Sequence, residues 1–179
     1  MKHLIKLSGL VAAMLLSLCT APSAVAAVPH FSWGADVGGA IDMTTNNMSS
    51  INIDVYFGYR SSFIDMAGIG VGLNTMVNTS LRTYPVYGIL RTSFTSRPSL
   101  AFMDMRAGCS FNSESKGDSH PSFFISPGVG FHLARSQNFR SYIILSYVFN
   151  DLRSYSVDSR EYDFSAGLHF ACLRIGVSF

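Results

Sequence analysis

The sequence predicts an all-β protein, specifically an eight-stranded antiparallel up-and-down transmembrane β-barrel. Three observations lead to this prediction: an N-terminal export leader, an alternation of apolar and polar residues, and an unusual composition. The mean hydropathy is +0.27 and only 13% of residues are charged. A spanning helix would need a run of about 18 apolar residues, and none follows the leader. A membrane barrel instead spreads its apolar residues over alternate positions.

The stretch INIDVYFGYR, at residues 51–60, shows the alternation most clearly. Its odd positions, from Ile51 to Tyr59, are all apolar or aromatic, whereas its even positions include Asn52 and Asp54. A period of two places these two sets on opposite faces of a strand. Along the chain, the polar face is small or charged and lacks the bulk of a soluble hydrophobic core. The apolar face is therefore expected to meet lipid, and the polar face to line the interior.

Eight such segments can be distinguished, and each is long enough to cross a bilayer as a tilted strand of about 9–11 residues. They cover residues 31–43, 51–60, 64–77, 84–94, 100–111, 121–135, 139–150 and 162–179. Short connections at 61–63, 95–99 and 136–138 alternate with longer ones at 44–50, 77–83, 112–120 and 151–161. Outer-membrane barrels have short periplasmic turns and longer external loops. Both termini are therefore expected in the periplasm and the longer loops outside the cell.

Residues 1–26 have the features of a secretory signal peptide, which leaves residues 27–179 as the expected barrel domain. Lys2 and Lys6 supply a positive start, an apolar stretch follows, and Ala24-Val25-Ala26 matches a cleavage site. Removal of the leader leaves 11 basic and 11 acidic residues. This neutral balance does not favour a nucleic-acid partner.

Two cysteines remain after the leader, Cys109 and Cys172. The strand assignment puts them on non-adjacent strands, so we expect two free thiols. No spacing of Cys and His resembles a metal site, and we expect neither a metal nor another cofactor.

Two positions disturb the pattern and predict irregular strands. Pro127 lies inside a strand, where it cannot donate a ladder hydrogen bond, so we expect a β-bulge there. In the last segment the apolar residues change from even to odd positions, and a bulge near Ala171 would reconcile the two halves.

The chain ends in ACLRIGVSF, with Leu173, Ile175, Val177 and Phe179 at alternate positions. This ending resembles the C-terminal signature that the barrel-assembly machinery reads in outer-membrane β-barrels. With the leader and eight strands, the chain resembles the small OmpA/OmpX-like, porin-type barrels, without the peptidoglycan-binding domain of full OmpA-type proteins. The resemblance implies an integral protein of the Gram-negative outer membrane. Its implied partners are outer-membrane lipid, lipopolysaccharide and the assembly machinery, but the fold fixes no activity.

The alternation also places six charged residues on the interior face at similar heights. They are Asp36, Asp54, Arg91, Asp104, Arg106 and Arg174. Closure of the barrel would bring Arg174 beside Asp36, and Arg91 adjoins the strand that carries Asp104 and Arg106. Since an eight-stranded barrel is only just wide enough for its own side chains, we expect a packed network of ion pairs in the lumen.

This interior favours a structural, adhesion or surface-recognition role. One alternative is a narrow gated pore, in which rearranged ion pairs admit small solutes or ions. A second is a lipid A-modifying enzyme that uses Asp163, Ser165 and His169, but residues four apart on a strand are separated by about 13 Å. We therefore expect no enzyme. A soluble lipocalin-like barrel would need the opposite polarity, with apolar residues inside.

Overall fold

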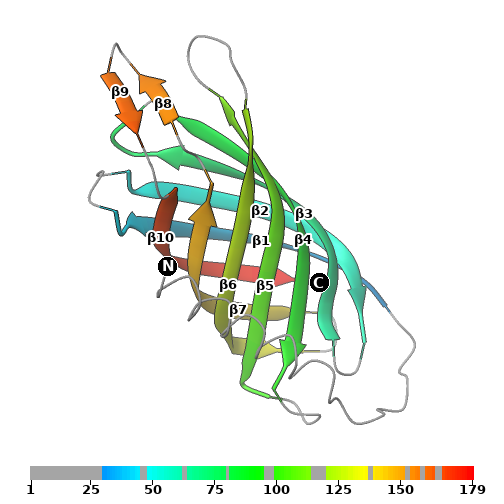
Figure 1. The fold of residues 1–179 in the computed structure, drawn as a ribbon. Coiled ribbons are helices and arrows are strands. Elements are labelled where there is room, and N and C mark those ends of the chain that lie inside the picture. Colours follow the sequence, from blue (N-terminus) through cyan, green and yellow to red (C-terminus); the bar gives the residue numbers. More distant parts are fainter. Residues whose placement is uncertain are drawn as a thin grey trace, which may run out of the picture.

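The computed structural model describes residues 30–44, 48–61, 64–79, 81–94, 99–113, 120–136, 139–151, 154–157, 160–163 and 167–179. The expected signal peptide, residues 1–26, lies outside this range. Eight antiparallel strands close into one barrel, so the predicted fold class is confirmed (Figure 1). None of the helices in the described part of the chain is long and apolar enough to cross a membrane.

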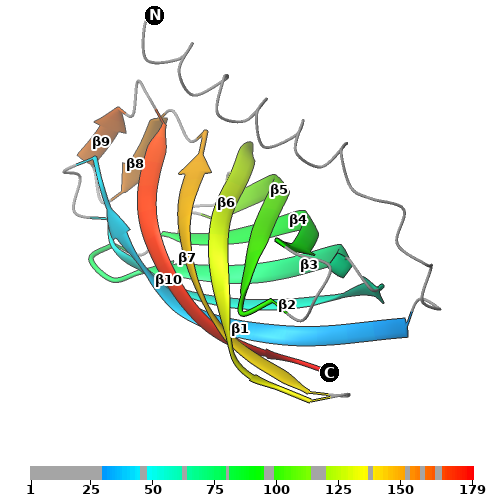
Figure 2. The same cartoon turned by 90° about the horizontal axis from the view of Figure 1, so that it is seen from below.

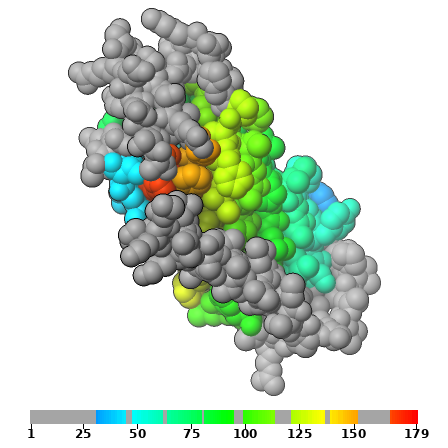
Figure 3. All heavy atoms as spheres, viewed as in Figure 1, coloured from blue at the N-terminus to red at the C-terminus, as the bar shows by residue number. Residues whose placement is uncertain are grey.

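The eight barrel strands follow one another around the wall in chain order, and the last pairs with the first. They are β1 (His30–Asp42), β2 (Ser50–Arg60), β3 (Ile64–Met76), β4 (Arg82–Ser93), β5 (Ala101–Ser113), β6 (His120–Arg135), β7 (Arg140–Asn150) and β10 (Leu168–Ser178). The turned view shows β10 lying beside both β1 and β7 (Figure 2). In the space-filling view, β6 to β3 form one continuous wall (Figure 3).

The barrel is apolar outside and largely polar inside, as the alternation predicts. Along β2, every residue from Ser50 to Tyr59 alternates between buried and exposed. Val55 is 48% exposed and Ile69 on β3 is 56% exposed, whereas Asp54 is buried. A soluble barrel would bury the isoleucine and expose the aspartate, so the lipocalin-like alternative is wrong.

The last strand is shorter than predicted. Residues 162 and 163, expected to begin it, instead belong to β9 (Arg160–Asp163), which pairs with β8 (Ser154–Val157). This hairpin projects beyond the end of the barrel wall (Figure 1). These residues therefore pair with a neighbouring segment and not with the barrel wall.

The bulges lie elsewhere than expected. The register runs without a shift past Pro127 on both sides of β6, and past Ala171 on both sides of β10. Shifts occur instead between Ile64 and Met66 on β3, and between His132 and Ala134 on β6. Both bulges lie near the end of the barrel that carries the short turns, and bulges are common at barrel rims.

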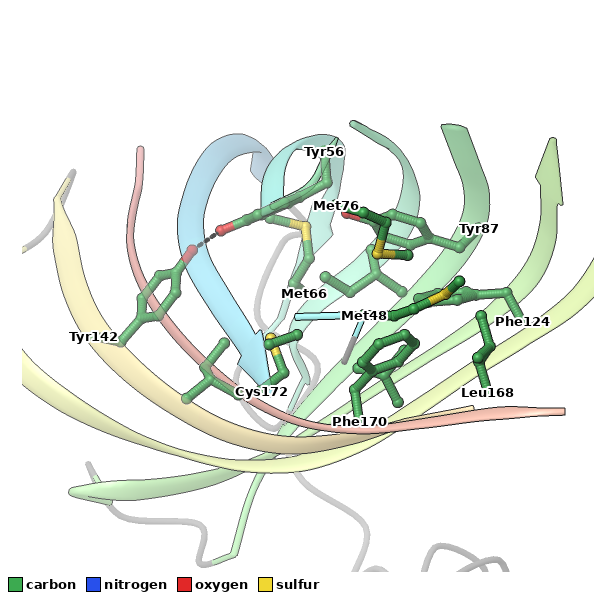
Figure 4. Packing of buried hydrophobic residues seen from close by; sticks show 14 of the residues in the cluster. Met48, Tyr56, Met66, Met76, Tyr87, Phe124, Tyr142, Leu168, Phe170 and Cys172 are labelled. Carbon is green, nitrogen blue, oxygen red and sulfur yellow. Dashed lines mark hydrogen bonds between the residues drawn. The ribbon is translucent and has the colours of Figure 1, made fainter. Parts of the chain in front are cut away.

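The even apolar residues of β10 need no bulge because they point into the barrel. Leu168, Phe170 and Cys172 are buried, and they pack with residues of other strands and of the connections. Figure 4 shows Met48, from the connection between β1 and β2, beside Phe124 and Leu168. The interior is thus not uniformly polar, contrary to expectation, because its loop end is filled by methionine, leucine and aromatic side chains.

The expected difference between short and long connections holds only in part. The connection between β4 and β5 covers 94–100 and is longer than that between β3 and β4, at 77–81. The connection between β7 and β10, which contains the β8–β9 hairpin, is much longer than the one at 61–63. Cys109 and Cys172 are both free thiols, as predicted.

Substitution of Gly68 tests the close approach of β2 and β3. A Cβ at Gly68 would lie 2.0 Å from the carbonyl oxygen of Phe57 and 2.6 Å from the Cα of Gly58. Because backbone cannot move aside cheaply, Gly68→Ala is expected to lower the free energy of unfolding by about 1–3 kcal/mol, measured by urea denaturation in lipid vesicles. Gly88→Ala is the matched control, since its nearest such contact is 3.8 Å. Equal stability of the two variants would contradict this packing.

Spin labels test the inside-out polarity. In a chain whose native cysteines are replaced, labels at Val55 and Ile69 should be relaxed strongly by oxygen, which concentrates in hydrocarbon. A label at Ser50, which is buried on the interior face, should be relaxed weakly. The measurement is power-saturation electron paramagnetic resonance in lipid vesicles. The reverse order of accessibility would place the apolar face inside a soluble protein.

Candidate functional site

Six charged side chains from five strands meet inside the barrel. Asp36 lies on β1, Asp54 on β2, Arg91 on β4, Asp104 and Arg106 on β5, and Arg174 on β10. All six are buried. Each occupies the interior face because it shares the parity of its strand's buried positions. The structure therefore brings together every lumen residue singled out in the sequence.

Arg106 is the centre of this network because it contacts all three aspartates. Its Nε lies 2.9 Å from Asp104 Oδ1, and its Nη1 lies 3.3 Å from Asp54 Oδ2. Its Nη2 pairs with Asp36 Oδ2. A planar guanidinium with five donors suits such a position, whereas a lysine offers only one point charge.

Arg91 links the network to a pair of tyrosines. Its Nε donates to Asp104 Oδ2 at 2.5 Å, and its Nη2 lies 3.3 Å from Asp36 Oδ2. Its Nη1 donates to the hydroxyl of Tyr56 at 2.7 Å. The guanidinium carbon also lies 4.5 Å from the ring centre of Tyr56 and 4.4 Å from that of Tyr142, at cation–π distance.

Arg174 has a different partner from the one expected. It was predicted to meet Asp36, but its Nε lies 3.4 Å from Asp54 Oδ2, and its Nη1 donates to Ser146 Oγ at 2.5 Å. The register explains the difference, because Asp36 pairs with Gly176 and Arg174 pairs with Gly38. Asp36 is instead occupied by Arg91 and Arg106.

Three tyrosines complete the site and were not singled out from the sequence. The hydroxyls of Tyr56 and Tyr142 point toward one another and are hydrogen bonded (Figure 4). Tyr142 also donates to Asp36 Oδ1, and Tyr87 donates to Asp54 Oδ1 at 3.0 Å. The sequence did place Tyr56 on the same face of its strand as Asp54. The alternation gives no reason, however, to expect that a tyrosine on this face binds the charged residues.

The network balances its charges, with three carboxylates against three guanidiniums. An unpaired ion in a confined interior is costly, and a paired one with its hydrogen bonds satisfied is tolerated. The pairs span the lumen from β1 and β2 across to β5, so they join opposite walls. The site is a set of ion pairs that links opposite walls of the barrel.

The rim residues considered for lipid A chemistry do not form a described site. Ser165 lies outside the described residues, and Asp163 belongs to β9. The Nδ1 of His169 is hydrogen bonded to the hydroxyl of Tyr147, and its ring lies 5.1 Å from that of Phe149. In the described part of the chain, no group of three or more His, Cys, Asp or Glu side chains could hold a metal ion.

The residues of the C-terminal signature lie on the outer face at the seam of the barrel. Leu173, Ile175 and Phe179 are exposed. Phe179 exchanges two backbone hydrogen bonds with Trp33, of 2.8 and 3.2 Å, and the two rings stack with centres 4.8 Å apart. These contacts close the wall between β1 and β10, and the proposed reading by the assembly machinery stays a prediction.

The polarity of the wall and the buried charges decide the class of protein. The chain is a small eight-stranded transmembrane β-barrel. No family model matches the sequence, and no curated protein matches it either.

Several solved outer-membrane barrels resemble the structure at low sequence identity. The N-terminal β-barrel domain of Pseudomonas aeruginosa OprF is 11% identical, with 83% of this chain and 97% of that one covered and a TM-score of 0.49. Neisserial surface protein A is 15% identical, with 87% and 98% covered and a TM-score of 0.48. The Yersinia pestis outer membrane protein Ail is 12% identical, with 84% and 100% covered and a TM-score of 0.46.

Removal of the central guanidinium tests the network. Arg106→Met leaves three buried carboxylates with two arginines, and breaking a buried ion pair on one side costs about 3–5 kcal/mol. The expected result is a loss of this size in the free energy of unfolding, measured by urea denaturation in lipid vesicles. Arg82→Met is the matched control, because Arg82 is exposed at the start of β4. A similar stability of both variants would show that the lumen charges are solvated.

Proposed function

We propose that this protein is an integral outer-membrane β-barrel with a structural, adhesion or surface-recognition role and a lumen that is plugged. The observation that carries the proposal is the buried, charge-balanced network inside a wall with an apolar outer face. The outer face fits a bilayer, and lipid is accordingly the first expected partner. The network fits a barrel whose interior holds the wall rigid and conducts nothing.

The arrangement along the axis supports a plug over a gated pore. An ion that entered the lumen would first have to separate Arg106 from its aspartates. It would then meet the apolar cluster at the loop end, where Met48, Leu168 and Phe170 are buried. Apolar constrictions exclude ions because they offer nothing in place of the hydration shell. Both barriers act in series.

The proposed orientation puts the short turns and both chain termini in the periplasm, with the longer loops outside the cell. The β8–β9 hairpin would then be the most prominent described feature of the outer surface. A hairpin that pairs locally, at the end of a rigid wall, can present side chains without disturbing the barrel. This geometry supports recognition or adhesion, with lipopolysaccharide as a neighbour of the loops.

Conductance separates the plug from the pore. Purified protein in a planar lipid bilayer at neutral pH should give no discrete channels, because the ion pairs and the apolar cluster block the axis. The companion variant Arg106→Ala removes the central cation but keeps the apolar cluster, which is the second barrier in series, so it should give no channels either. Insertion is verified independently by protease protection and by carbonate extraction.

Two outcomes would overturn the proposal. Discrete channels in the wild-type protein that disappear in Arg106→Ala would establish the gated pore. Release of the wild-type protein into the soluble fraction on carbonate extraction would remove the membrane assignment altogether.

A further inference from the structure

A second group of charges lies at the other end of the lumen, where the strands meet the short turns, and the network described above does not use it. It consists of Arg60 on β2, Asp65 on β3, His132 and Arg135 on β6, and Arg140 on β7; we refer to it as the arginine cluster. Ser32, Ser93 and Ser178 border it. This end of the lumen therefore holds three guanidiniums and a single aspartate.

Asp65 makes contacts with several partners at once. Its Oδ1 pairs with Arg140 and lies 3.6 Å from Arg135 Nη2. Its Oδ2 accepts a hydrogen bond of 2.6 Å from Ser93 and lies 3.7 Å from His132 Nε2. Arg60 reaches only the backbone oxygen of Asp65, at 3.4 Å, and otherwise donates to Ser32 and Ser178. One carboxylate cannot satisfy the donors around it.

Three buried side-chain nitrogens of this cluster lack a hydrogen-bond partner. Arg140 Nε and both ring nitrogens of His132 are buried without a hydrogen-bond partner. The His132 side chain is only 7% exposed and lies against Phe102, with ring centres 4.7 Å apart. Buried polar groups are nearly always hydrogen bonded, so such a group needs an explanation. A ligand that accepts hydrogen bonds would satisfy the donors among these groups.

The strand register also holds like charges together. Arg135 and Arg140 are direct partners across β6 and β7, and like charges opposite one another destabilise a sheet. The two bulges found in the wall, at Asp65 and near Leu133, turn the chain locally at this rim. Bulges of this kind re-aim side chains. The strand register and the bulges therefore bring arginine side chains together at this rim, although the repulsion between them is unfavourable in the isolated protein.

We infer that the arginine cluster binds a phosphate group at the turn end of the barrel. A phosphate offers several acceptor oxygens in an arrangement that matches guanidinium forks. It would relieve the repulsion between Arg135 and Arg140 and accept from donors that Asp65 leaves free. The side chains of Arg135 and Arg140 are 30% and 11% exposed, so a ligand has access from the turn end of the lumen. The group can come from a phospholipid headgroup of the nearby leaflet or from free phosphate.

The test uses the whole barrel in nanodiscs of phosphatidylcholine, with inorganic phosphate titrated at constant ionic strength. Arginine Nε–H signals are followed by nuclear magnetic resonance. We expect saturable shifts of the cluster signals. Arg140→Gln should weaken the affinity about tenfold, because charge-assisted hydrogen bonds are lost. Arg135→Gln, whose side chain is more exposed, should weaken it as well and serves if Arg140→Gln does not fold. Arg82→Gln, at the opposite end, should bind like the wild type.

A second arm replaces part of the phosphatidylcholine with phosphatidylglycerol. If the lipid headgroup is the source, these discs shift the same arginine signals without added phosphate, and the shifts are lost in Arg140→Gln. If free phosphate is the source, the signals respond to phosphate alone. Absence of saturable shifts with either probe, or an equal loss in Arg82→Gln, would overturn the inference. Since the discs contain only inserted barrels, this result would leave the proposed membrane function intact.

Discussion

Neutralisation of charge inside a narrow wall is the constraint on which this structure depends. Arg106 can occupy the lumen only because Asp36, Asp54 and Asp104 come to it from three other positions on the wall. The glycines facing these groups follow from the same constraint. A Cβ at Gly72 would lie 2.4 Å from Asp54 Oδ1, and one at Gly38 would lie 2.8 Å from Arg174 Cγ. A charged side chain on one strand thus requires a glycine beside it on the neighbouring strand.

The interior is divided along its length into three zones of different chemistry. Apolar side chains and neutral amides fill the loop end, where Asn52 donates to Asn74 at 2.9 Å and Asn74 to Thr83 at 3.1 Å. The balanced ion pairs occupy the middle. The turn end holds arginines in excess of their single aspartate. The residues of the wall alternate regularly, whereas the residues of the lumen differ from one zone to the next. The chemical features particular to this barrel therefore lie in its lumen.

Periodicity made most of the wall predictable, and the lumen residues with it. Once the parity of β2 was known, Asp54 had to point inward, and the same held for Arg106 on β5. The alternation does not determine the stagger between neighbouring strands. It therefore could not predict that Arg174 contacts Asp54 and not Asp36. It also could not show that residues 160–163 pair with a neighbouring segment, since a hairpin and a wall strand share one pattern. The interior position of Phe170 was not predicted, because the alternation assigns apolar residues to the face that contacts lipid.

The arginine cluster was missed for a related reason. Arg60 and His132 lie on the polar face that the alternation predicts, but Asp65 and Arg135 lie at two bulges that break it, so the cluster could not be assembled from parity. Their sequence signal is only a concentration of arginine at the short turns.

The stacked pair of Trp33 and Phe179 joins the two ends of the barrel sequence. Neighbouring contacts at this seam link residues 147 positions apart, so the barrel has a high contact order. Until β10 arrives, β1 and β7 each present an open edge, and open edges pair with other chains. Asp54 also lacks Arg174 until then. A nearly complete chain is therefore an aggregation hazard that only its final strand removes, which makes the assembly cooperative and dependent on a protected route to the membrane.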